Sequence, residues 1–109
     1  MTPPKADRAT DYTNDAQQRI LKVTLALFGD VVTGYSPAAL AKAVGCAAPV
    51  ITRDLDNLKT AGLAERDELT GQWRLTPRLP QQAIKVWNAI DHAQRRIDDA
   101  RNRFSRNPD

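Results

Sequence analysis

Apolar residues recur three and four positions apart in several stretches of the chain, which is the spacing of amphipathic helices. The first stretch has a broad apolar stripe made of Ile20, Leu21, Val23, Leu25, Leu27 and Phe28. Asn14 can cap a helix at its start, with Gln17 as the second half of a capping box, and Gly29 can stop it. The pattern therefore predicts a first helix between Asn14 and Gly29.

The next segment, residues 30–35, is short and rich in β-branched residues, so we expect an extended connection or a minimal edge strand there. Ser36 followed by Pro37 then signals a helix start, because serine caps a helix and proline suits its first position. This second helix is predicted over residues 38–44 and ends at Gly45.

A third helix is predicted to begin near Pro49 and to close at Gly62. Its apolar residues are spaced four and three positions apart and are Ile51, Leu55 and Leu58. Leu40 and Val44 of the second helix can share a core with them, and Gly45 allows a tight corner between the two helices. The pair therefore has the layout of a helix-turn-helix.

Two short extended runs, residues 63–68 and 72–76, follow this helix and are separated by a turn that contains Gly71. They predict a β-hairpin in which Trp73 and Leu75 alternate onto the core face. The order of elements predicts a mostly α fold with a small β-hairpin wing, a winged helix-turn-helix, followed by one long C-terminal helix.

That last helix is predicted from Pro80 to Phe104, because apolar residues alternate three and four apart along it. They are Ala83, Val86, Ile90, Ala93, Ile97, Ala100 and Phe104. A repeat of this kind over three heptads is the seam of a coiled coil. We expect the helix to mediate homodimerisation, with contacts made by Val86, Ile90, Ile97 and Phe104.

The residues that flank this seam leave two alternatives open. They are neutral or positive, namely Gln94, Arg96, Arg101 and Arg103, so a self-pairing coil would bring arginines near one another. The helix can instead fold back on its own domain, or its arginines can face DNA or an acidic partner. Trp87 fits a partner-facing anchor and a cover for the domain's flank equally well.

Composition bounds the organisation of the chain. Its 109 residues suit one compact domain, which we place at residues 13–79, with the long helix at 80–104. Residues 1–12 and 105–109 are predicted to be a flexible arm and tail. No stretch approaches the ~20 apolar residues of a membrane span, and no secretory signal is visible, so a cytoplasmic setting is expected.

The residue types present leave little for catalysis. A single cysteine, Cys46, excludes an intrachain disulfide and a cysteine-based zinc site, and we interpret it as small buried filler between two helices. His92 is the only histidine and is expected to be solvated. Asp98 and Asp99 are adjacent on a helix and diverge by ~100°, which argues against a shared metal site. We therefore expect no enzyme activity, no metal and no cofactor.

Four segments of the sequence together resemble those of a known family. The segments Ser36-Pro-Ala-Ala-Leu-Ala-Lys-Ala-Val-Gly45, Val50-Ile-Thr-Arg-Asp-Leu-Asp-Asn-Leu58, Ala61-Gly-Leu-Ala-Glu-Arg-Asp67 and Trp73-Arg-Leu75 together resemble the DNA-binding domain of the IclR family. The resemblance covers roughly Ala16 to Leu79 and implies a winged helix-turn-helix that binds double-stranded DNA. It does not extend to the large ligand-binding domain of that family, so no small-molecule effector is expected.

In this motif the start of the third helix faces the major groove. The expected DNA contacts are therefore Ala48, Pro49, Thr52 and Arg53, together with Ser36 and with Arg66 and Arg74 on the hairpin. Arg53 can make a forked contact to guanine or grip a phosphate, and both options stay open. The hairpin tip, Asp67-Glu-Leu-Thr-Gly71, is acidic, which is unusual for a wing that touches phosphates.

The sequence thus predicts a transcriptional regulator that occupies an operator, in two half-sites if it is a dimer. Its net charge of +3 is compatible with DNA, although most of the excess lies beyond residue 80. The alternative is a protein-interaction module built on the same fold. A positive patch around Arg53 that is continuous with Arg66 and Arg74 would favour DNA.

Overall fold

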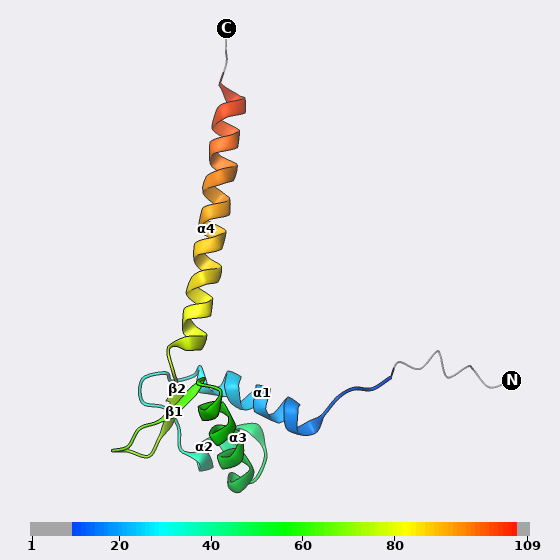
Figure 1. The fold of residues 1–109 in the computed structure, drawn as a ribbon, viewed down its shortest axis with the longest axis vertical. Coiled ribbons are helices and arrows are strands. Elements are labelled where there is room, and N and C mark those ends of the chain that lie inside the picture. Colours follow the sequence, from blue (N-terminus) through cyan, green and yellow to red (C-terminus); the bar gives the residue numbers. More distant parts are fainter. Residues whose placement is uncertain (1–9, 107–109) are drawn as a thin grey trace, which may run out of the picture.

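Three helices and a two-stranded hairpin pack together, and one long helix projects away from them (Figure 1). The computed structural model describes residues 10–106. Its elements are α1 (Asp15–Leu27), α2 (Pro37–Val44), α3 (Ala48–Thr60), β1 (Ala64–Arg66), β2 (Trp73–Leu75) and α4 (Arg78–Ser105). The mostly helical fold with a small hairpin and a long last helix is therefore confirmed. No helix in the described part of the chain is long and apolar enough to cross a membrane.

The predicted helix starts are confirmed by their caps. The Asn14 side chain accepts a hydrogen bond from the backbone N–H of Gln17 (3.0 Å) at the start of α1. The Ser36 hydroxyl accepts one from the N–H of Ala39 (3.1 Å) at the start of α2, where Pro37 occupies the first turn. Gly45 ends α2 with φ of 86°, a left-handed conformation that suits glycine and turns the chain toward α3.

The core lies where α1, α2, α3 and the hairpin meet. Its buried apolar residues are Val23, Leu27, Leu40, Ala41, Ile51, Leu55, Leu58, Ala64, Trp73 and Leu75. Trp73 is thus a core residue, as its alternation with Leu75 predicted. The apolar stripe of α1 is only partly used, because Leu21, Leu25 and Phe28 stay exposed.

The hairpin pairs β1 and β2 in antiparallel register, with Ala64 opposite Leu75 and Glu65 opposite Arg74. The connection before α2 adds a single antiparallel bridge, in which Tyr35 and Trp73 exchange two backbone hydrogen bonds of 2.8 Å. Residues 31–33 form a turn, so the connection carries no full strand.

The long helix α4 begins at Arg78, two residues before the predicted start, and runs through Ser105, which sequence analysis placed in the tail. Thr76 anchors its base through hydrogen bonds to the carbonyl groups of Gly62 (2.7 Å) and Leu63 (3.0 Å). Leu79 is half-buried against the core. No residue of α4 is fully buried, so the helix does not fold back on its own domain.

The predicted arm and tail otherwise fall largely on residues 1–9 and 107–109, which lie outside the described residues.

Candidate nucleic-acid interface

Helix α3 separates a buried face from an exposed one. Ile51, Leu55 and Leu58 point into the core, whereas Pro49, Thr52 and Arg53 are exposed. Three of the residues predicted to contact DNA therefore share the outer side of the first half of the helix. The Thr52 hydroxyl donates to the carbonyl of Ala48 (3.1 Å), so its oxygen can still accept a hydrogen bond.

Two other residues of the predicted set are less accessible: Ala48, the first residue of α3, and Ser36, the cap residue before α2. Ala48 is half-buried and packs against the core. Ser36 is also half-buried, and its hydroxyl is occupied as the cap of α2. They hold the two helices in place rather than presenting free side-chain groups.

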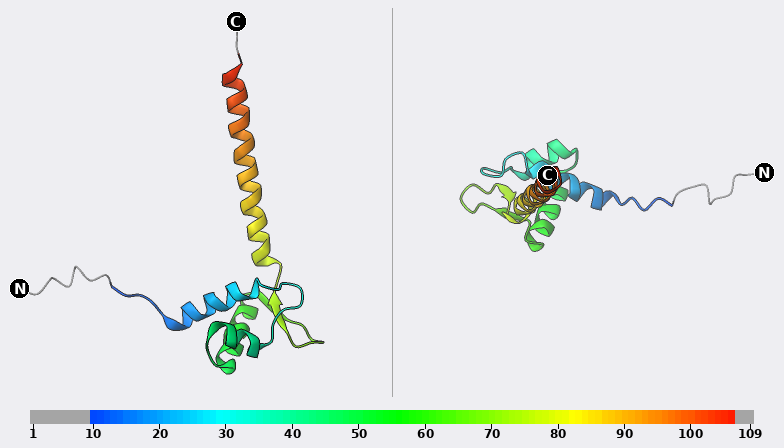
Figure 2. Two further views of the ribbon diagram at one scale, coloured as in Figure 1. Left: turned by 180° about the vertical axis from the view of Figure 1, so that it is seen from behind. Right: turned by 90° about the horizontal axis from the view of Figure 1, so that it is seen from above.

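The start of α3 is open at the end of the domain farthest from α4 (Figures 1 and 2). Ala47 precedes the helix and makes no side-chain capping bond, and no acidic residue occupies the first turn. No acidic side chain of the first turn therefore neutralises the positive end of the helix dipole, and the residues directly before the helix, Cys46 and Ala47, are small. An anionic group such as a phosphate is favoured there.

Asp54 adds no negative charge to the exposed face of α3. Its side chain points inward, and the residue is only 5% exposed. Arg19 on α1 holds it with two bonds, Nε to Oδ2 at 2.6 Å and Nη2 to Oδ1 at 3.0 Å. The hydrogen bonding to the Asp54 carboxylate raises the pKa of Arg19 above its ordinary value. Of the acidic residues on α3, only Asp56 is exposed.

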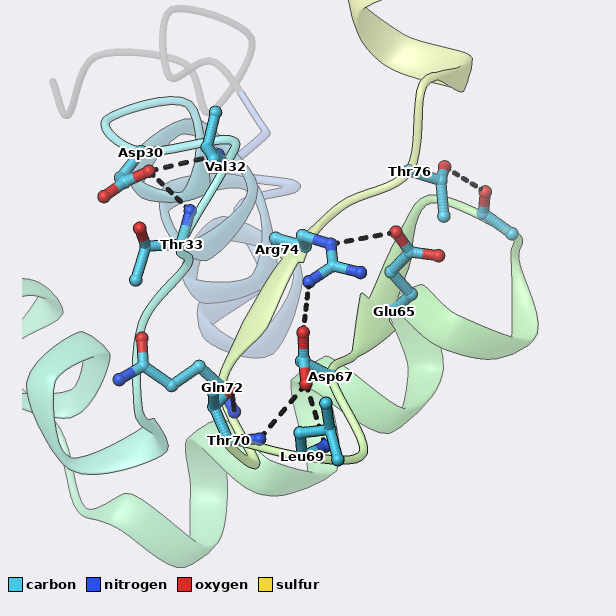
Figure 3. A network of polar contacts seen from close by, with 11 residues as sticks. Asp30, Val32, Thr33, Glu65, Asp67, Leu69, Thr70, Gln72, Arg74 and Thr76 are labelled. Atoms are coloured by element: carbon cyan, nitrogen blue, oxygen red, sulfur yellow. Dashed lines mark hydrogen bonds and ion pairs between the residues drawn. The ribbon is translucent and has the colours of Figure 1, made fainter.

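Arg74 sits between two acidic side chains on the hairpin (Figure 3). Its Nε contacts Oε1 of Glu65 at 3.1 Å, and its Nη1 contacts Oδ2 of Asp67 at 2.8 Å. Arg74 is therefore committed to ion pairs within the hairpin. The charge of Arg74 is therefore not available to a positive patch with Arg53 and Arg66, which was the arrangement that would favour DNA.

The same network balances the acidic hairpin tip. The Asp67 carboxylate also accepts hydrogen bonds from the backbone N–H groups of Leu69 (2.8 Å) and Thr70 (3.1 Å). The bond from Arg74 and these two backbone bonds lower the pKa of Asp67 to about 2. The Asp67 charge thus closes the turn and is neutralised locally, which leaves Glu68 as the exposed acid of the tip.

Two arginines of the predicted DNA-contact set make no ion pair in the described part of the chain. Within residues 10–106, Arg53 and Arg66 take part in no ion pair, and both are exposed. The Arg66 guanidinium lies over Gly71, where an added Cβ would come within 3.0 Å of its Nη2 atom. The hairpin tip also exposes Leu69 almost completely, at 97%.

The predicted dimer contacts are all accessible on α4. Val86, Ile90, Ile97 and Phe104 are between 51% and 79% exposed, and the guanidinium of Arg103 lies 4.8 Å from the centre of the Phe104 ring. Trp87 is exposed too, so it does not cover the domain's flank.

The single cysteine and the single histidine of the chain differ in their exposure. Cys46 is half-buried and packs against the core, as expected of filler, and His92 is exposed on α4. In the part of the chain that the structure describes, no three His, Cys, Asp or Glu side chains gather as a metal site would need.

Arg19 is the residue that sequence reasoning missed. It lies 35 positions from Asp54, and nothing in the local pattern of either helix signals the pairing. Comparison with known proteins adds no assignment: no family model, curated protein or solved structure matches the chain.

Proposed function

We propose that residues 13–79 form a winged helix-turn-helix that binds double-stranded DNA sequence-specifically and regulates transcription by occupying its site. The observation that carries this proposal is the outer face of α3. Arg53 is exposed there without an ion pair, while its neighbour Asp54 is turned inward and neutralised by Arg19. The ordering of α2, a glycine corner, α3 and a hairpin supports the same assignment.

In this account the first half of α3 enters the major groove. Arg53 has the fork geometry to bond O6 and N7 of one guanine, or else to clamp a phosphate. Thr52 offers a methyl group and a hydroxyl oxygen to base edges, and Pro49 lets the helix approach closely. Arg66, exposed on the shoulder of the hairpin, reaches the sugar–phosphate backbone beside the groove.

The domain supplies few cations of its own, so a single copy is expected to bind weakly. Helix α4 exposes an apolar seam that a second copy can cover, and we include homodimerisation through it in the proposal. Each copy of the dimer then presents one DNA-contacting face, so the dimer can engage two DNA sites at once.

Selection of bound duplexes from a random pool tests this function directly. Enrichment of a sequence motif at moderate salt is expected for the parent chain, and Arg53→Ala should weaken it. Lys59→Ala serves as the matched control, because it removes one positive charge from the exposed last turn of the same helix. No enrichment with the parent chain would overturn the proposal.

A protein-interaction module is the second candidate, and one observation favours it. The hairpin tip exposes Leu69 rather than a cation, and Arg74 is held in ion pairs. A tip of this kind is suited to an apolar pocket on another protein. Failure of the duplex selection, with the fold intact, is the result that this candidate predicts.

A further inference from the structure

The exposed seam of α4 contains the residues Ala83, Val86, Ile90, Ala93, Ile97, Ala100 and Phe104. Its large members are half exposed or more, and no residue of the helix is fully buried by the chain's own domain. A heptad seam of this length is the pattern by which two helices pair. The charged residues next to the seam favour one relative orientation of the two helices over the other.

Two rows of residues flank the seam. One row consists of Gln82, Ala89, Arg96 and Arg103, and the other consists of Trp87, Gln94 and Arg101. In a parallel pair, each residue of the first row faces the residue five positions later in the second row of the other helix. Arg96 would then face Arg101 of the second copy, and symmetry would repeat this repulsion. No acidic residue stands in either row to offset it.

An antiparallel pair removes every one of these contacts between arginines. When two copies of α4 overlap over their full length, each row faces itself in reverse order. Arg96 then faces Ala89 of the second copy, and Arg103 faces Gln82. In the other row Gln94 faces Trp87, so a polar amide lies against the exposed indole, and Arg101 faces Pro80.

The seam residues also fit this register. Ala83 meets Ala100 of the second copy, Val86 meets Ile97, and Ile90 meets Ala93. These layers join two small residues, two large ones, and a large with a small one, and Phe104 falls opposite Leu79 at the base of the second copy's helix. We propose that α4 pairs with a second copy in antiparallel orientation, and that the resulting dimer bridges two separate DNA duplexes.

The bridging part rests on the proposed DNA binding and on the direction of α3. The start of α3 lies at the end of the domain opposite to α4 in both side views (Figures 1 and 2). An antiparallel pair places the two domains at opposite ends of a helix of 28 residues, about 42 Å long at 1.5 Å per residue. The two candidate DNA faces then point away from each other, so one straight duplex cannot meet both.

Single cysteines test the orientation without DNA. In a Cys46→Ser background, Ala83→Cys and Ala100→Cys chains are mixed and treated with a short bismaleimide. An antiparallel pair gives cross-links between position 83 and position 100 only. In a parallel pair these positions lie about 25 Å apart along the helix, so each chain would cross-link only to its own kind. That second result, or a monomer at high concentration, overturns the proposal.

Capture of one duplex by another tests the bridging. A duplex fixed to beads should retain a second, fluorescent duplex in the presence of the parent chain, about tenfold more than with Ile90→Asp. Asn88→Asp, on the outer side of α4, is the matched control and should capture like the parent. Single-duplex binding without capture overturns bridging alone. Loss of all duplex binding, with the 83-to-100 cross-link intact, overturns bridging together with the proposed function but leaves the antiparallel pairing standing.

Discussion

Arg19 of α1 and Asp54 of α3 form a two-pronged ion pair, with Nε–Oδ2 and Nη2–Oδ1 distances of 2.6 and 3.0 Å. It joins the first helix to the inner side of the candidate DNA-contacting helix. The pair therefore has two consequences, one for stability and one for charge. It fixes the rotation of α3, and it removes a carboxylate from the face that carries Arg53.

Replacing Arg19 with methionine should destabilise the domain, because Asp54 would remain buried as an unpaired carboxylate. We expect the Tm to fall by roughly 10 °C or more in thermal unfolding followed by circular dichroism. Combining Arg19→Met with Asp54→Leu removes the charge together with its partner and should recover most of the loss. A single variant as stable as the parent would show that the pair does not hold α3.

The hairpin should lose stability in acid through Asp67. Its folded pKa of about 2 lies below the ordinary 3.8, so the ionised carboxylate stabilises the fold above pH 3.8, and this contribution disappears as the pH falls toward 2. At about pH 5 the Tm of the parent should therefore be higher than that of the Asp67→Asn variant, and the two Tm values should converge between pH 4 and pH 2.

Glu68→Gln provides the control for that experiment, because Glu68 is an exposed acid of the same tip. Its Tm should follow that of the parent throughout the titration. A constant difference between the parent and Asp67→Asn at all pH values would mean that the charge of Asp67 does not close the turn.

The seam of α4 should be dispensable for folding of the domain and required for self-association. Ile90→Asp places a carboxylate in the middle of the proposed pairing surface, where burial of an unpaired charge is costly. Light scattering should show a monomer, while the helical circular dichroism is largely retained. A parent that is monomeric at high concentration, or a variant that unfolds, would contradict dimerisation through α4.

Local signals in the sequence predicted most of the elements of the fold. The caps at Asn14 and Ser36, the corner at Gly45 and the alternation of Trp73 with Leu75 each depend on residues close together in the chain. The same periodicity could not tell which of the apolar residues on α1 would be covered. Leu25 continues the stripe in sequence but remains 71% exposed, because burial depends on where the other helices pack.

The candidate site was predicted less completely, because its charges are set by contacts between distant residues. The sequence predicted an acidic hairpin tip and placed Arg74 among the DNA contacts. The structure instead pairs Arg74 with Glu65 and Asp67 across the hairpin, and pairs Asp54 with Arg19. No spacing rule predicts such pairs, which require the folded arrangement.

Duplex binding by Arg53 variants as a function of salt is the most direct test of the proposed function. If four phosphates are neutralised, log affinity should fall with log salt with a slope of about −3.6 in fluorescence anisotropy. If Arg53 makes two hydrogen bonds to one guanine, Arg53→Ala should lose about 1–3 kcal/mol of binding free energy and relax the specificity at that base. Arg53→Lys should not restore that specificity. If Arg53 holds a phosphate, all sequences should weaken alike. Three results would contradict the account: no binding to any duplex, an affinity that does not change with salt, or an Arg53→Ala chain that binds like Lys59→Ala and the parent.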